Sequence, residues 1–136
     1  MNTYRARVGL ARENDRRRNV STALDLVRND VIPKLAERVL LKPNFFSSTS
    51  QVTSTHVDAV RGALDFLQSV PNPPSEVIIA EGGNEGYSGE AFDNYGYRAL
   101  ASEVPFAVRF VDLNEEERWQ ETEIVLADGS PYTVRM

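Results

Sequence analysis

The segment EVIIAEGG, residues 76–83, joins a short apolar run to a glycine-rich turn. Its β-branched centre is typical of a strand that is buried on both faces. A helical pattern begins soon after it, near Glu90, with Ser88 available as the helix cap. Strand, turn and helix in this order form part of a βαβ unit. The segment therefore predicts a parallel sheet.

The alternation of strand and helix continues on both sides of this segment. Residues 3–11 alternate polar and apolar side chains with period two, and residues 38–42 are a short apolar run closed by Pro43. Asn19 or Ser21 can cap a helix that ends near Pro33, because proline cannot continue it. The predicted strands are 3–11, 38–42, 76–80 and 107–111, and the predicted helices cover about 19–32, 55–68 and 90–104.

The C-terminal region predicts a β-hairpin. Residues 121–127 and 131–135 flank Asp128-Gly129, a pair that tolerates the positive φ of tight hairpin turns. We therefore expect an α/β fold of three layers. Its mostly parallel open sheet has about four strands, with helices on both faces and the hairpin at the C-terminus. No linker divides the sequence, so residues 1–136 are expected to form a single domain.

Composition excludes several classes of function. The chain has 136 residues, 41% of them hydrophobic and 26% charged, which is ordinary for a globular domain. No apolar run reaches the roughly 18 residues of a membrane span, and the N-terminus lacks a secretory h-region, so we expect a soluble cytoplasmic protein. With no cysteine, the chain cannot itself ligate an iron–sulfur cluster.

Charge disfavours nucleic acid as a partner. The formal net charge is −5, and the one dense basic run is Arg16–Arg18. A nucleic-acid-binding protein usually presents a broad basic face. We expect this run to be a solvated loop, with a contact to an anion or a nucleic acid as the alternative.

Polar residues follow the predicted strands where each strand ends. Lys42 and Asn44 follow one strand, Glu81 follows the next, and Asp112 ends the last parallel strand. His56 opens the helix after the 38–42 strand, with Thr55 expected as its cap. Ligands of open parallel sheets bind beyond the carboxyl ends of the strands. The candidate ligand-binding residues are Lys42, Asn44, His56, Glu81, Gly82, Gly83, Ser88 and Asp112.

Two ligand chemistries fit these residues. Glu81 and Asp112 are oxygen ligands that suit a divalent cation such as Mg²⁺, Mn²⁺ or Ca²⁺. The whole set suits a small molecule with hydroxyls and one anionic group. Each residue also has a structural interpretation: Lys42 can form a salt bridge, Asn44 can cap its own loop, and the acids can accept bonds from turn amides. In that case the chain is a non-catalytic interaction or structural module.

Nucleotide binding is a third hypothesis. The loop Gly82–Gly89 lies between a strand and a helix, the position of phosphate-binding turns. Its glycine spacing is not G-x-G-x-x-G, and the acids at 81 and 85 would repel a pyrophosphate. We expect at least one of Gly82, Gly83 and Gly86 to have a positive φ.

Five segments carry a family resemblance: VLLKPN at 39–44, TSTHVDAV at 53–60, VIIAEG at 77–82, AFDNYGY at 91–97 and VDLN at 111–114. In order and approximate spacing, over about residues 3–114, the chain resembles the N-terminal half of domain of unknown function family 362. The resemblance implies a bacterial or archaeal protein of uncharacterised activity, often joined to ferredoxin-like iron–sulfur modules. It also implies a second half that carries a Lys-x-His segment.

A missing half would leave apolar surface without cover. The candidates for this surface are Phe45, Phe46 and Trp119. Large exposed apolar patches usually mark interfaces. We therefore expect either the second half of the family domain or a second copy of the chain to cover them. The function favoured by the sequence is a small-molecule or metal-binding domain of an iron–sulfur-linked redox enzyme.

Overall fold

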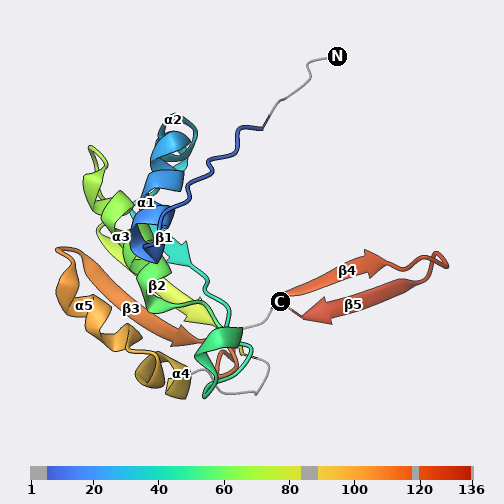
Figure 1. Cartoon of the computed structure of the whole chain (residues 1–136). Coiled ribbons are helices and arrows are strands. Elements are labelled where there is room, and N and C mark those ends of the chain that lie inside the picture. The colour runs from blue at the N-terminus through green and yellow to red at the C-terminus, as the bar shows by residue number, and fades with distance from the viewer. Residues whose placement is uncertain (1–5, 84–88, 118–119, 136) are drawn as a thin grey trace, which may run out of the picture.

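The computed structural model describes residues 6–83, 89–117 and 120–135 (Figure 1). Within them, three strands form a parallel sheet in the order β1–β2–β3, and two more form an antiparallel hairpin. The strands are β1 (Arg38–Leu41), β2 (Glu76–Glu81), β3 (Ala107–Asp112), β4 (Glu121–Val125) and β5 (Pro131–Arg135). The predicted parallel α/β class and C-terminal hairpin are confirmed, but the parallel sheet has three strands instead of about four.

The strand predicted at residues 3–11 is missing from the described part of the sheet. Residues 6–11 belong to no strand, and Val8 and Leu10 are 87% and 84% exposed. Gly9 lies so close to a neighbouring helix that a Cβ there would be 2.1 Å from the carbonyl oxygen of Ala23. The segment therefore packs beside a helix. Its alternating pattern indicated an extended chain but not what that chain would contact.

The helices are α1 (Arg16–Leu26), α2 (Arg28–Val31), α3 (Val57–Ser69), α4 (Gly89–Asn94) and α5 (Leu100–Glu103), with 3₁₀ turns η1 (Ile32–Lys34), η2 (Gln51–Thr53) and η3 (Tyr97–Ala99). Helix α1 begins earlier than predicted, because the Asp15 carboxylate accepts a hydrogen bond of 2.9 Å from the Arg18 N–H. The basic run at 16–18 is therefore the first turn of a helix, and its interpretation as a loop was wrong. Pro33 lies in η1 directly after α2, as its ring requires.

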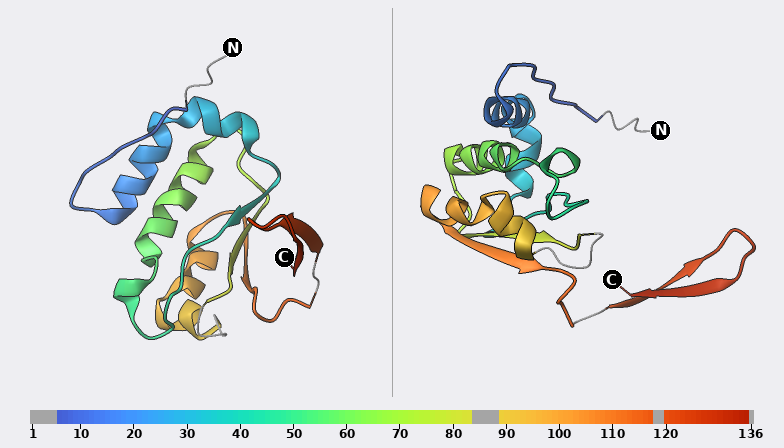
Figure 2. Two further views of the ribbon diagram at one scale, coloured as in Figure 1. Left: turned by 90° about the vertical axis from the view of Figure 1, so that its right-hand side faces the viewer. Right: turned by 60° about the horizontal axis from the view of Figure 1, so that its bottom comes forward.

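The described helices gather on one face of the parallel sheet (Figure 2). Right-handed crossovers from β1 to β2 and from β2 to β3 place α3, α4 and α5 on the same side, and α1 packs against α3. The side chains on this face belong to the core: Val39, Leu41, Val77, Ile79, Val108 and Phe110. The expected three layers are therefore two. On the opposite face Leu40 is 61% exposed, Ile78 is half-buried and Ala80 is buried.

An aromatic cluster joins the helices to the loop after β1. Phe45 is 2% exposed and meets Phe92, Tyr95 and Tyr97 edge-on, at centroid distances of 5.1–5.8 Å. The expectation that Phe45 is exposed was wrong. Phe46 is exposed, and Trp119 lies outside the described residues.

The hairpin turns at Asp128-Gly129 as predicted, although its first strand ends at Val125 instead of residue 127. Gly129 adopts a φ of 82°, and the Asp128 carboxylate accepts a hydrogen bond from the Ser130 N–H. Among the described helices, none combines the length and apolar character needed to cross a membrane.

Candidate functional site

Three of the predicted site residues meet at the carboxyl edge of the parallel sheet. The register of β2 and β3 ends with Glu81 opposite Asp112, and Lys42 directly follows β1. This placement follows from parallel pairing, because parallel strands all end at the same edge. The side chains, however, make separate sets of contacts.

Glu81 is a buried carboxylate, 3% exposed, that is held from two sides. The Lys42 ammonium donates to its Oε2, and the Phe45 backbone N–H donates to its Oε1 at 3.2 Å. Lys42 also donates to the Pro43 carbonyl at 3.2 Å. The pair therefore ties the loop after β1 to the end of β2. It also has an electrostatic effect, because burial and the nearby Glu81 charge raise the pKa of the Tyr97 phenol.

Asp112 ties the end of β3 to the start of α4. Its Oδ2 accepts from the Gly89 N–H at 3.0 Å, and its Oδ1 accepts from the Asn114 N–H at 2.9 Å. The Asn114 amide donates to the Gly83 carbonyl at 3.3 Å, on the other side of the glycine loop. Asp112 thus fixes both flanks of that loop.

The expected positive φ at the glycine loop is not found at Gly82. The described glycines with positive φ are Gly96 and Gly129, which lie elsewhere. Gly86 and Ser88 lie outside the described residues. The phosphate-turn hypothesis therefore gains nothing from the described part of the loop.

The geometry gives no support to a cation held by Glu81 and Asp112. Among the described residues, no group of three or more His, Asp or Glu side chains is arranged to hold a metal ion. Both oxygens of Glu81 already accept hydrogen bonds, and Lys42 balances its charge. The salt bridge foreseen as the structural interpretation of Lys42 is the arrangement observed.

His56 caps helix α3 in place of Thr55. Its Nδ1 accepts from the Asp58 N–H at 3.2 Å and also lies 3.3 Å from the Asp58 carboxylate. When Nδ1 accepts this bond, the proton of a neutral ring is on Nε2. The Thr55 hydroxyl instead accepts from the Asn44 N–H at 2.9 Å. The Asn44 side chain donates to the Thr53 carbonyl at 3.3 Å. Asn44 therefore braces its own loop, and His56 keeps a donor for a further partner.

Two adjoining cavities, together named the α3 cleft, lie between α1, the end of β1 and the start of α3. Both are lined by Thr55 and Ala59. The smaller, of about 220 Å³, is also lined by Val20, Leu41, Lys42, Pro43, Val60 and Ala63. The larger, of about 400 Å³, is also lined by Arg16, Gln51, Val52, Ser54 and His56. The cleft combines an apolar floor with the basic side chains of Lys42, His56 and Arg16. The sequence did not place Arg16 among the site residues and gave an anion contact of its basic run only as an alternative, although an Asp directly before a run of helix formers marks a helix start.

A family model matches residues 39–130, from β1 to the turn of the hairpin. This chain belongs to the family described as Domain of unknown function (DUF362). The matched segment covers most of the chain, and it begins and ends later than the expected 3–114. Searches of curated proteins and of solved structures found no match.

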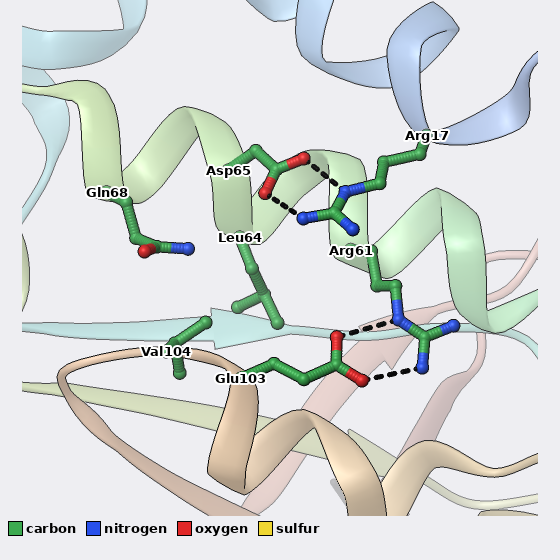
Figure 3. Close-up of a pocket in the computed structure, with 7 residues that line it drawn as sticks. All are labelled: Arg17, Arg61, Leu64, Asp65, Gln68, Glu103 and Val104. Carbon is green, nitrogen blue, oxygen red and sulfur yellow. Dashed lines mark hydrogen bonds and ion pairs between the residues drawn. The ribbon is translucent and has the colours of Figure 1, made fainter.

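A second polar cleft of this DUF362 chain, where α1, α3 and α5 meet, is shown in Figure 3. Arg17 pairs with Asp65 at 2.5 and 2.6 Å, and Arg61 pairs with Glu103 at 2.7 and 2.8 Å. The remaining free volume is about 10 Å³, room for a single water at most. The paired arginine holds the pKa of Glu103 below its ordinary value. These ion pairs brace the helices and leave no space for a ligand.

Proposed function

We propose that this DUF362 chain binds a small molecule with one anionic group, a carboxylate or a phosphate, in the α3 cleft. The observation that carries the proposal is a pair of cavities that share Thr55 and Ala59, the larger lined by Arg16 and His56 and the smaller, mainly apolar one lined by Lys42. Small-molecule sites typically have mostly apolar walls and a few polar groups that fix orientation. The start of α3 adds the positive end of a helix dipole.

The donors of the cleft favour an anion over a divalent cation. The Lys42 side chain is 56% exposed, and its ammonium has three protons, two of which are donated to Glu81 and Pro43. The third proton and the His56 Nε2–H are available to a bound oxygen. A divalent cation would instead be repelled by Arg16, whose charge lies at the larger cavity.

A ligand-binding role fits a domain that acts together with other domains or proteins. The family resemblance implies a link to iron–sulfur redox chemistry. Any such cluster would be ligated by cysteines outside residues 1–136, because these residues contain none. The competing proposal is an interaction module in which the same polar residues only brace loops.

Thermal unfolding with inorganic phosphate and with small carboxylates, at matched ionic strength, tests the proposal. A ligand at about ten times its Kd stabilises the folded state by about 1.4 kcal/mol, which raises Tm by about 5 °C for a chain of this size. Arg16→Gln should reduce the rise in Tm. Lys34→Gln, which removes a charge that does not line the cleft, should not. The proposal fails if no anion raises Tm, or if both variants respond as the unmodified chain does.

A further inference from the structure

We infer that the ligand of the α3 cleft is an amphiphile, one acyl chain with a carboxylate or a phosphate at its end. The inference rests on the proposed anion site and adds the class of molecule that bears the anionic group. It comes from a third cavity, of about 210 Å³, which we name the tail cavity. Besides Leu41 and Ala63, the tail cavity is lined by Leu24, Val31, Leu35, Val39, Phe66 and Leu67.

The tail cavity continues the α3 cleft. It shares Leu41 and Ala63 with the smaller cavity of the cleft. The smaller cavity in turn shares Thr55 and Ala59 with the larger one. The three cavities therefore adjoin in a row, and the two ends of the row differ in chemistry. One end has basic side chains, and the other is apolar.

Helical spacing explains this row. On α1, Arg16 lines the larger cavity of the cleft, Val20 the smaller one and Leu24 the tail cavity, at intervals of four residues. Residues four apart lie on one face of a helix. On α3, the face toward the cavities runs from Ala59 to Leu67. The two helices pack side by side (Figure 2), so the row of cavities follows both of them.

The tail cavity suits an apolar group. Every described side chain that lines it is aliphatic or aromatic, so it offers a water molecule few hydrogen-bonding partners. Replacing water there with an apolar tail is favourable. Leu24, Leu35 and Val39 are only half-buried although they pack against the core, so the surrounding elements leave the cavity unfilled.

The length of the row favours an acyl chain over a small anion alone. From Ala59 to Leu67, α3 rises about 12 Å at 1.5 Å per residue. Acetate or inorganic phosphate would occupy only the basic end of such a row. A medium-length acyl chain would reach from that end into the tail cavity.

The anionic group of the amphiphile fits the basic end. Arg16 is exposed and lines the larger cavity together with His56, whose Nε2–H is a donor when Nδ1 accepts from the Asp58 N–H. The Asp58 carboxylate is paired with Arg61 at 2.8 Å, which offsets its repulsion of an anion. A head group held there leaves the tail to extend toward Leu24.

Calorimetric titration of the unmodified chain with butyrate, hexanoate and octanoate tests the tail at a constant head group. We expect Kd to fall about fourfold for each methylene that enters the tail cavity. Octyl phosphate should bind more tightly than inorganic phosphate for the same reason, and comparison with octanoate identifies the preferred head group. Octanol, which has the tail without the charge, should bind about tenfold more weakly than octanoate or less tightly still.

A substitution at the junction of the cavities tests the location. Ala63→Leu puts a larger side chain where the tail cavity meets the cleft, so it should remove the gain from butyrate to octanoate and leave phosphate binding unchanged. Ala101→Leu makes the same change at an exposed alanine of α5 and should bind every ligand as the unmodified chain does. Far-UV circular dichroism checks that both variants are folded.

Photolabelling gives a second measurement that needs no substitution. Octanoate with a diazirine at its methyl end is irradiated with the unmodified chain, and mass spectrometry locates the label. We expect it on residues of the tail cavity, such as Leu35, Phe66 or Leu67. Label confined to other surfaces, such as the exposed Phe46, would overturn the inference.

The titrations separate this inference from the proposed function. If butyrate and octanoate bind with the same Kd, the anion site stands and the apolar tail is overturned. The amphiphile is also overturned if octanol binds as tightly as octanoate, or if Ala63→Leu binds octanoate as the unmodified chain does. If no anion of any length binds, the inference and the proposed function both fail.

Discussion

Replacing Lys42 with Met tests how far the fold depends on the ion pair at the end of β2. Glu81 is 3% exposed, so the substitution leaves a buried carboxylate without its cation. Removing one partner of a fully buried pair costs about 3–5 kcal/mol. Here the Lys42 side chain is 56% exposed, so water reaches the vacated position, and the Phe45 N–H still donates. We therefore expect a loss of about 2 kcal/mol, below the range for a fully buried pair.

Urea unfolding followed by circular dichroism measures this loss as a lower midpoint with an unchanged m-value. The double variant Lys42→Met/Glu81→Gln removes the buried charge but keeps an oxygen that can accept from the Phe45 N–H. It should recover at least half of the lost stability. Lys34→Met, at an exposed lysine in η1, should stay within about 0.5 kcal/mol of the unmodified chain.

Two outcomes would refute this reasoning. If Lys42→Met unfolds at the same urea concentration as the unmodified chain, the lysine does not offset the burial of Glu81. If the double variant is less stable than Lys42→Met alone, the carboxylate is tolerated without its cation, and the loss has another origin.

Three further substitutions probe the packing of the helices. Gly62→Ala should lower stability despite a gain in helix propensity of about 1 kcal/mol, because the new Cβ would lie 2.2 Å from the Arg17 carbonyl oxygen; a rise in Tm would contradict this. Phe45→Ala should cost about 3–5 kcal/mol in urea unfolding, as a cavity in the aromatic cluster. Glu103→Gln should cost about 1 kcal/mol or less at neutral pH. Because Arg61 lowers the pKa of Glu103, the ion pair stabilises the fold fully above the pKa of the unfolded chain, 4.5, and this stabilisation disappears as pH falls through the pKa of the folded chain. A loss of stability on Glu103→Gln that is as large in acid as at neutral pH would contradict this.

Among the strands predicted from the sequence, those that the structure confirms are the ones that pair with a neighbouring strand. The apolar centre of β2 and the Asp-Gly turn of the hairpin define local conformations that the tertiary structure keeps. Residues 6–11 show the limit of this reasoning. Their period-two pattern fits a strand, but Gly9 permits a close approach to Ala23, and the segment packs beside α1.

The sequence predicts that the site residues lie at one edge of the sheet, but it does not predict the contacts of their side chains. Parallel strands bring Lys42, Glu81 and Asp112 to one edge whatever their side chains do. Whether the two acids share a cation depends on side-chain direction and on nearby backbone donors, which periodicity does not encode. The adjacent aromatics Phe45 and Phe46 make the same point, since one is buried and the other is exposed.

The ion pair also determines which residue gives the α3 cleft its net charge. The Lys42 charge is balanced by Glu81, so the two together contribute almost no net attraction for an anion. Arg16 is exposed at the rim of the cleft and supplies the positive charge that remains. Arg16→Gln should therefore weaken anion binding while leaving the urea midpoint unchanged. Lys42→Met/Glu81→Gln removes both charges of the pair and leaves the net charge unchanged, so it should weaken anion binding less than Arg16→Gln does. If the double variant instead weakens anion binding as much as Arg16→Gln, Lys42 contributes to binding as strongly as Arg16, and the balancing of its charge by Glu81 does not extend to the ligand.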